Sequence, residues 1–383
     1  MKVLNIIKSI DIGGIEKMTL DFCSHAYKAG IEPHLICIGG GAMESDFRKS
    51  GAHFSIIKKI QRPFDIVDPF LIFRLRRYIK KHRIDIVYCR FADEGLHAWL
   101  ATRGLKKTAV ALEFAVDLGI NRKIDNKKFR WLAKRTEANI APSQTMLQQM
   151  HDYKMNQSPN NHFVHYGIDP DRVAQSHSTL RKELGIPQNA LLAGMVGNFY
   201  NNVRDQLTVC KALPTVIEKH PDFHFVFAGG YRNHWIKANY EYYNACLDFC
   251  KSHNIMHRVH FIGLRKDTSN IYAALDFYVH ATHFDTFGLA PVEAMLNRKA
   301  VIANDLPVFR EISKQGQGML LFDHKNHHEL ARKIIFLIEN QETRETLAMK
   351  HYIHALENYH IDIHLKNIKK LFQKILKENK KLP

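Results

Sequence analysis

The 383-residue sequence lacks three features that would define its class. No apolar run reaches the roughly 18 residues that a membrane-spanning helix needs, and the six cysteines form no C-x-x-C pair or evident ligand cluster. No sustained apolar segment follows Lys2, so a signal peptide is not expected. We therefore expect reduced cysteines and a cytoplasmic protein.

Acidic residues are also scarce relative to basic ones. The chain has 38 Asp and Glu against 55 Lys and Arg, a formal net charge of +17, which favours an anionic partner. The basic residues are dispersed over both halves without a recognised nucleic-acid-binding motif, so we expect no nucleic acid partner. Residues 74–83 and 122–135 are dense in Lys and Arg, and the second run also contains Phe129 and Trp131. These runs are either solvated helix faces or a surface that lies on anionic lipid.

Strand-like and helix-like segments alternate along the whole chain, and its length suggests two domains. Residues 3–7 read as a buried strand, Gly13 and Gly14 as a tight turn, and the residues that follow as a helix and a second strand. This order is a βαβ unit. The sequence therefore predicts an α/β protein with two Rossmann-like domains, an architecture that does not by itself fix a function.

The most informative stretch is 280–297, which reads HATHFDTFGLAPVEAMLN. Pro291 suits the first turn of a helix, and Gly288 allows a close approach of the backbone to a ligand. Free N–H groups at such a turn favour a phosphate. Asp285 and Glu293 flank the turn, which matches the layout of a nucleotide-diphosphate sugar. Alternatively, Asp285 is an ordinary loop acid and Glu293, placed in the first helical turn, only favours the helix N-terminus.

This stretch resembles the E-x7-E motif of the retaining GT-B glycosyltransferases of family 4, written here as Asp285-x7-Glu293. The resemblance implies that Asp285 contacts the hydroxyls of the donor sugar and that Glu293 contacts the ribose. It also implies that the backbone between them holds the diphosphate, at Thr286, Phe287, Gly288 and Leu289. Asp285 departs from the usual glutamate because its side chain is one methylene shorter.

The resemblance extends to the domain organisation, with two Rossmann-like domains that face a central cleft. It implies an acceptor-binding domain over 1–175 and a nucleotide-sugar-binding domain over 176–360. A C-terminal helix over 361–383 is then expected to cross back onto the first domain. The apolar stripe of this helix comprises Leu365, Ile368, Leu371, Phe372 and Ile375.

Two further segments of the second half match donor-binding positions of the family. Asn198 stands where the family has an arginine, and Arg204 where it has a lysine, and this pair usually neutralises the leaving diphosphate. Arg204 can bind phosphate bidentately, whereas Asn198 is neutral, so one positive charge is missing. Gly263 and Leu264 stand where the family binds the nucleotide base through backbone groups. The alternatives are a solvated cation at Arg204 and a simple turn at Gly263.

The first half carries weaker signals. Gly13 and Gly14 match a glycine pair that lies over the cleft in the family, which implies acceptor contacts and, for Gly14, a donor contact. The family often has a histidine near the end of the fifth strand, but Glu113 stands in that region and is taken as a cleft residue. Asp169 and Asp171 spell a D-x-D metal motif, which we discount because the intervening Pro170 indicates a linker turn. No metal and no cofactor are expected.

Taken together, the resemblance implies a metal-independent, retaining hexosyltransferase with Asp285, Glu293 and Arg204 as catalytic residues. Its donor is expected to be a UDP-sugar, and its acceptor a hydroxyl of a cell-surface glycan or lipid-linked glycan, as in bacterial polysaccharide or lipopolysaccharide biosynthesis. A peripheral position on the inner face of the cytoplasmic membrane follows. Two alternatives stay open. One is a sugar-nucleotide epimerase of the same fold, although this sequence has no evident set of His and acidic residues for proton abstraction. The other is a basic nucleic-acid-binding protein.

Overall fold

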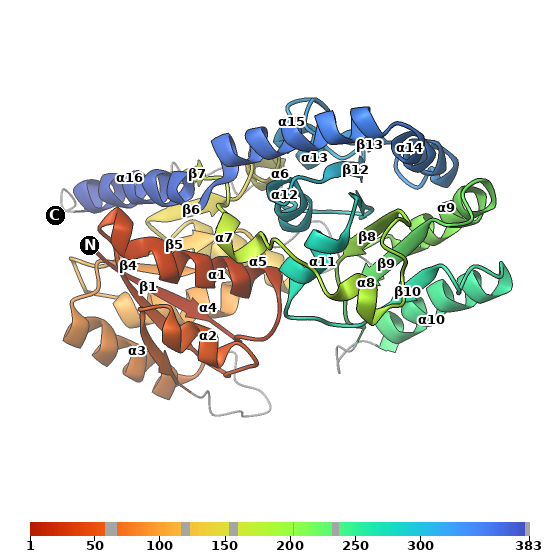
Figure 1. Ribbon diagram of the computed structural model, residues 1–383. Helices are drawn as coiled ribbons and strands as arrows, with labels where there is room; N and C mark the ends of the chain where they lie inside the picture. The colour runs from red at the N-terminus through yellow and green to blue at the C-terminus, as the bar shows by residue number, and fades with distance from the viewer. Residues whose placement is uncertain (58–66, 116–122, 153–159, 202, 232–236, 380–383) are drawn as a thin grey trace. The chain divides into compact units, whose positions relative to one another are not determined.

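The chain forms two compact units, each built on one sheet, in the computed structural model (Figure 1). Unit 1 comprises Met1–Ile168 and Ile361–Pro383, and unit 2 comprises Asp169–His360. Both sheets are entirely parallel in the described strands, so the predicted α/β architecture with two Rossmann-like sheets is confirmed. The structure describes residues 1–57, 67–115, 123–152, 160–201, 203–231 and 237–379.

The sheet of unit 1 has seven strands in the order β3-β2-β1-β4-β5-β6-β7. Both faces of its central strands are covered, and Val3–Ile7 are therefore buried without alternation, as in parallel sheets generally. The strands are β1 (Lys2–Ile7), β2 (Glu32–Cys37), β3 (His53–Ile56), β4 (Ile86–Cys89), β5 (Ala109–Glu113), β6 (Ala138–Ala141) and β7 (Asn161–Phe163).

The helices of unit 1 come from both ends of the chain. They are α1 (Gly14–His25), the short 3-10 helix η1 (Ala26–Ala29), α2 (Glu44–Lys49), α3 (Pro69–His82), α4 (Ala92–Thr102), α5 (Lys123–Ala133), α6 (Gln144–Asp152) and α16 (Ile361–Asn379). The boundaries of α3 follow from its sequence. Asp68 accepts hydrogen bonds from two backbone N–H groups of the first turn, and Pro69 occupies the first helical position.

Helix α16 supplies a large part of the core of unit 1. All five residues of its predicted apolar stripe are buried, and the helix packs against α1 and η1. The ring of Phe372 meets Tyr88 of β4 edge-on, with 5.5 Å between ring centroids. The stripe prediction is confirmed, because an amphipathic helix is stable here only with its apolar face against the sheet.

The sheet of unit 2 has six strands in the order β10-β9-β8-β11-β12-β13. The strands are β8 (Leu192–Val196), β9 (His224–Ala228), β10 (Val259–Phe261), β11 (Phe277–His280), β12 (Ala300–Asn304) and β13 (Leu320–Phe322). The helices are α7 (Pro170–Val173), α8 (Leu180–Glu183), α9 (Gln206–Lys219), α10 (Lys237–Ser252), α11 (Thr268–Ala274), α12 (Leu289–Leu296), α13 (Pro307–Ile312), α14 (His327–Glu339) and α15 (Gln341–Tyr359). The strand order reverses between β8 and β11, and ligands of open α/β sheets bind at the carboxyl ends of such strands.

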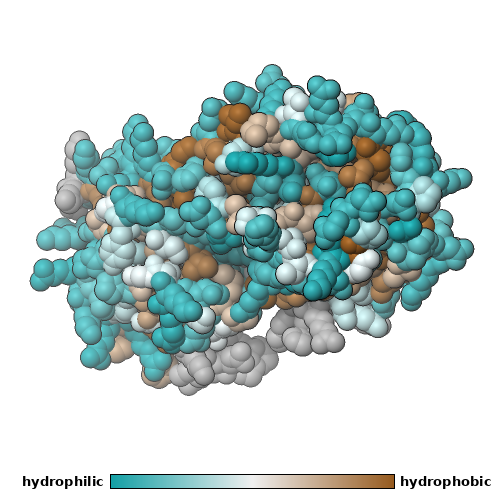
Figure 2. Space-filling model, in the orientation of Figure 1, coloured by the Kyte–Doolittle hydropathy of each residue, from teal (hydrophilic) through white to brown (hydrophobic). Residues whose placement is uncertain are grey.

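The surface of both units is mainly hydrophilic on the face that Figure 2 shows, where hydrophobic side chains appear as small separate patches. Within the part of the chain that the structure describes, every helix is too short or too polar to cross a bilayer.

Replacement of Phe372 by alanine should destabilise unit 1 by about 3–5 kcal/mol, because it leaves a cavity among fully buried side chains. Urea unfolding followed by circular dichroism measures the loss. Lys374→Ala on the same helix is the control, since this side chain is 59% exposed and should leave the transition unchanged. Equal transitions for wild type and Phe372→Ala would contradict the packing of α16 in this core.

Candidate active site

The candidate site lies where β8 and β11 end, at the reversal of strand order in unit 2. Two loops leave these neighbouring strands, one toward α9 and one toward α12. Backbone hydrogen bonds join the loops: the N–H of Asp205 donates to the carbonyl of Ala281 at 3.0 Å, and the N–H of His283 donates to Val203 at 2.8 Å. The residues after both strands are therefore held as one rigid edge.

An ion pair connects the same two loops. The Nη1 atom of Arg204 donates to the Oδ2 atom of Asp285 at 2.9 Å and to the hydroxyl of Thr282 at 2.9 Å. The Asp285 side chain is only 12% exposed, so its charge depends on this guanidinium. The other guanidinium N–H groups of Arg204 make no hydrogen bond to the described residues, and they are available to an anionic ligand.

The turn between Asp285 and α12 differs from the prediction in one respect. The Oδ1 atom of Asp285 accepts hydrogen bonds from the N–H groups of Phe287 at 3.2 Å and of Gly288 at 2.9 Å. These are two of the amides that were expected to bind diphosphate. The shorter aspartate side chain explains the difference, because aspartate readily bonds to backbone groups two and three residues further along.

Gly288 is required at this turn for two reasons. Its φ of +92° lies in the left-handed region that favours glycine. A Cβ atom added there would lie 2.8 Å from the ring of Phe309. Phe287 points into the core and meets the ring of Tyr359 edge-on, whereas Thr286 and Leu289 are half-buried.

The charge of Asp285 is fixed by its surroundings. Burial alone would raise the pKa of this carboxyl, but Arg204, His280 and the N–H of Phe287 together hold the pKa well below its usual range. Burial lowers the pKa of His280 to about 4, so this imidazole is neutral near pH 7. Its Nδ1 atom lies 3.1 Å from the hydroxyl of Tyr278, and its Nε2 atom lies 3.8 Å from Asp285.

Glu293 is held by residues from two other helices. Its Oε1 atom accepts a hydrogen bond from Arg172 of α7 at 3.1 Å, and its Oε2 atom accepts one from the hydroxyl of Tyr272 of α11 at 2.9 Å. Because α12 begins at Leu289, Glu293 lies in the second helical turn and not in the first as expected. Its orientation is therefore explained by these partners and not by the helix dipole.

The remaining donor positions follow neighbouring strands of the same sheet. Asn198, after β8, accepts a hydrogen bond from the N–H of Gly230 at 2.8 Å and so ties the ends of β8 and β9 together. Gly263 follows β10 with a φ of +70°, and Leu264 beside it is 53% exposed. These positions lie along the carboxyl edge that also carries Arg204 and Asp285.

The predicted residues of unit 1 occupy two different settings. Gly13 and Gly14 begin α1, with Gly13 half-buried and Gly14 exposed. Glu113 is completely buried, 3.1 Å from the Nε atom of Arg90, which is itself buried. The structure thus gives Glu113 a structural task, because the charge of Arg90 requires a partner in the interior. Its role as a cleft residue stays a prediction.

The sequence interpretation assigned no role to four residues of this site: Arg172, Tyr272, His280 and Thr282. His280 and Thr282 carried a usable signal, since polar residues at the end of a parallel strand point to a site. Arg172 carried none, because it lies 121 positions from Glu293. The discounted D-x-D pair has a structural role, in which Asp169 caps α7 by accepting from the N–H of Asp171.

Two family models match the chain. The model of "Glycosyltransferase Family 4" matches residues 12–172, and that of "Glycosyl transferases group 1" matches residues 176–353. An O-antigen biosynthesis glycosyltransferase of Escherichia coli, WclY, is 26% identical over 208 residues, which cover 53% of this chain and 50% of that protein. An uncharacterized glycosyltransferase of Methanocaldococcus jannaschii, MJ1178, is 30% identical over 107 residues, 27% of this chain and 30% of that protein. The chain thus spans half or less of the length of these curated relatives.

Solved structures match over almost the whole chain. Anabaena HepE in complex with UDP and glucose has a TM-score of 0.83 at 19% identity and covers 97% of this chain and 99% of its own. WaaG, a glycosyltransferase involved in lipopolysaccharide biosynthesis, has a TM-score of 0.71 at 14% identity, with coverage of 97% and 99%. At sequence identities this low, the structural likeness establishes a common fold and nothing more.

The ion pair between Arg204 and Asp285 should show strong coupling in a double-mutant cycle. Arg204→Gln should destabilise unit 2 by about 3–5 kcal/mol, because it leaves a buried carboxylate without its cation. Adding Asp285→Asn should recover about 1–3 kcal/mol of that loss. Urea unfolding of the wild type, both single variants and the double variant gives the coupling energy, and strictly additive losses would show that the pair contributes nothing.

Proposed function

The chain belongs to glycosyltransferase family 4, the group 1 glycosyl transferases, and has their GT-B fold; on this basis we propose that it is a retaining enzyme that transfers a sugar from a UDP-sugar to a glycan hydroxyl. The observation that carries the proposal is the placement of Arg204, Asp285 and Glu293 around one glycine turn at the carboxyl edge of the unit 2 sheet. The UDP complexes of HepE support the choice of nucleotide.

In the proposed donor complex, the residues along this edge divide the ligand between them. Glu293 accepts hydrogen bonds from the ribose hydroxyls, since Arg172 and Tyr272 fix the direction of its carboxylate. The backbone at Gly263 and Leu264 contacts the base. Asp285 faces the donor sugar, and Arg204 binds the diphosphate through the N–H groups that Asp285 leaves free.

The proposed reaction breaks the bond between the anomeric carbon and the phosphate oxygen. Negative charge then develops on the diphosphate, and a preorganised guanidinium lowers the free energy of that transition state. The acceptor oxygen bonds to the same face of the anomeric carbon, so the configuration is retained. The acceptor proton passes to the departing phosphate.

Metal independence forms part of the proposal. Arg204 supplies a fixed positive charge at the diphosphate position, and the N-terminal end of α12 adds a partial positive charge. Together they take the place that a divalent ion has in metal-dependent transfer. The neutral Asn198 contributes no charge, and it maintains the β8 and β9 loop ends instead.

Transfer should therefore proceed in EDTA. The test incubates the protein with a panel of UDP-sugars and candidate lipid-linked acceptors and measures both UDP release and glycosylated product.

Glu293→Gln should lower turnover roughly 10- to 100-fold, because a hydrogen bond to a charged group contributes about 1.5–3 kcal/mol. Glu218→Gln, at an exposed position of α9, is the matched control and should remain fully active.

Three results would contradict the proposed site, mechanism or reaction. Near-normal activity of a folded Glu293→Gln variant would remove Glu293 from the site. Complete loss of transfer in chelator, restored by a divalent ion, would reject the metal-free mechanism. Conversion of the donor sugar without any acceptor would instead favour an epimerase.

We also propose that the acceptor is lipid-linked and that α3 docks unit 1 on an anionic membrane. Phe70 and Phe73 are 56% and 65% exposed, and the basic side chains beside them on α3 point to solvent: Arg74, Arg77, Lys80 and Lys81. Exposed aromatic and basic residues on one helix are typical of interfacial binding. Part of the second basic run, 122–135, lies outside the described residues. The roles of WclY and WaaG in O-antigen and lipopolysaccharide biosynthesis support a lipid-linked glycan.

Neutralising the four exposed basic residues of α3 to serine should weaken binding to anionic vesicles by at least about tenfold, since each contributes about 1 kcal/mol near the surface. Arg76 is left unchanged because its guanidinium holds the end of α4 through the carbonyls of Ala101 and Arg103. Co-sedimentation at low and high salt measures the binding.

The matched control removes four exposed lysines of unit 2: Lys211, Lys251, Lys325 and Lys350. It should bind vesicles as the wild type does. The α3 variant should lose transfer to a lipid-linked acceptor but keep transfer to a soluble acceptor mimic. Equal losses on both acceptors would mean that these residues support the fold, and equal vesicle binding by both variants would reject docking through α3.

A further inference from the structure

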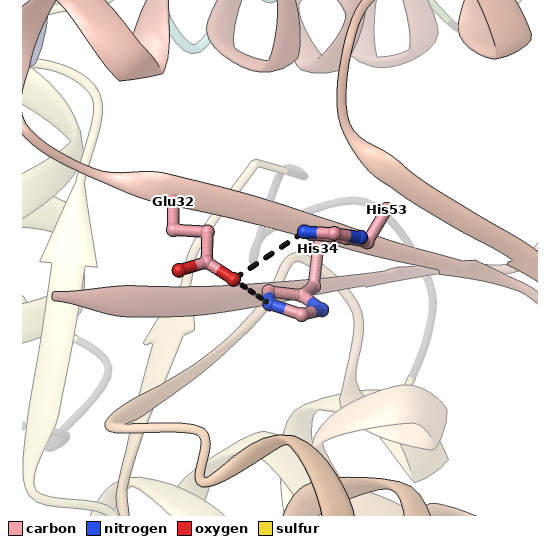
Figure 3. A group of neighbouring side chains, drawn as sticks. All are labelled: Glu32, His34 and His53. Carbon is pink, nitrogen blue, oxygen red and sulfur yellow. Dashed lines mark hydrogen bonds and ion pairs between the residues drawn. The ribbon is translucent and has the colours of Figure 1, made fainter.

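A group of potential metal ligands lies in the sheet of unit 1, at the amino-terminal ends of the edge strand β3 and of its neighbour β2. Glu32 and His34 come from β2, and His53 is the first residue of β3 (Figure 3). Residues two apart in a strand share one face, and His34 is the register partner of His53 in the parallel ladder. Strand geometry alone therefore brings the three side chains together.

The three ligand atoms have spacings close to those of a zinc site. The Oε1 atom of Glu32 lies 3.2 Å from Nε2 of His34 and 3.3 Å from Nε2 of His53. All three ligand atoms lie within 4.8 Å of one another. Atoms at about 2.0–2.2 Å from a tetrahedral zinc ion lie roughly 3.3–3.6 Å apart. The two histidine rings are stacked with 4.5 Å between their centroids, so the half-exposed His53 ring has to turn to complete the third edge of the tetrahedron.

The surroundings prepare His34 and Glu32 for coordination. Burial lowers the pKa of His34 to about 4, so its imidazole is neutral and can offer a lone pair near pH 7. Its Nδ1 atom lies 2.9 Å from the hydroxyl of Tyr78, an outer partner of the kind that orients metal-bound histidines. The Lys2 ammonium leads the interactions that lower the pKa of Glu32, so this carboxylate is ionised.

We propose that Glu32, His34 and His53 bind one zinc ion. The fourth position is open to water or to His82, whose ring lies 5.2 Å from that of His34. Two imidazoles and a carboxylate suit zinc, and the half-exposed His53 gives access from solvent. Bound zinc would replace the Lys2 ammonium at Oε1 and clamp the edge strand β3 to β2.

The proposed ion is structural and does not depend on the glycosyl transfer proposed above. The group lies at the amino-terminal ends of its strands, whereas ligands of open α/β sheets bind at the carboxyl ends. The alternative is a hydrogen-bonded trio without metal, in which both histidines donate to Glu32. A second trio in unit 2, Asp205, His283 and His324, also has ligand atoms within 4.8 Å and must be distinguished.

The test titrates chelator-treated full-length protein with Zn²⁺ by isothermal calorimetry and repeats the titration with Co²⁺ by absorption spectroscopy. Wild type should bind zinc, gain thermal stability that rises with the logarithm of the zinc concentration above the dissociation constant, and give the visible bands of tetrahedral cobalt. Glu32→Gln and His53→Ala should each weaken this binding by at least about tenfold. These positions are chosen because both are partly exposed, whereas removal of the fully buried His34 endangers the fold.

His324→Ala is the matched control, since it removes one histidine from the second trio only. It should leave the zinc affinity, the thermal shift and the cobalt spectrum of the Glu32 site unchanged. Unchanged zinc binding in a folded Glu32→Gln, His53→Ala double variant would overturn the proposal. So would a wild type that binds no zinc, or binding that is lost in His324→Ala, which assigns the ion to unit 2.

Discussion

The pairing of Arg204 with Asp285 is the interaction on which the candidate site depends. It joins the loop after β8 to the loop after β11, and these two strands are neighbours only because the strand order reverses there. The carboxylate of Asp285 in turn accepts hydrogen bonds from the backbone N–H groups of Phe287 and Gly288, and these bonds set the path of the chain into α12. One guanidinium therefore governs a buried charge, a turn and the start of a helix.

The two acids of the motif are held in different ways. Asp285 is bound to its own turn and to the adjacent loop, whereas Glu293 is bound by Arg172 and Tyr272 from α7 and α11. Movement of α7 or α11 would thus redirect Glu293 without disturbing Asp285. In the donor complex proposed above, such separate anchoring would let the nucleoside and sugar ends of the donor be positioned independently.

Local patterns in the sequence were sufficient for the fold and for the turn at which the candidate site is proposed. Alternating apolar runs predict both sheets, and the stretch DTFGLAPVE identifies the turn before α12. Long-range partners were not predictable, since no local pattern links Arg172 to Glu293 or Arg90 to Glu113. The hydrogen bonds from two turn amides to Asp285 do not follow from its shorter side chain alone, because that geometry depends on backbone angles. Glu113 is predicted as a cleft residue from its place near the end of the fifth strand, whereas its buried partner Arg90 follows a different strand, β4.

The return of α16 to unit 1 has a consequence for synthesis. Unit 2 is encoded as an insertion between two segments of unit 1, and the core of unit 1 contains side chains from both segments. A ribosome therefore completes unit 2 before it has made the last helix of unit 1, and domains generally fold as units as the chain emerges. The unit that comes second in the sequence can reach its native state first. Until α16 is made, the apolar face of unit 1 that this helix covers stays exposed. Chaperones that shield such a face would act on this protein late in translation and on its N-terminal part.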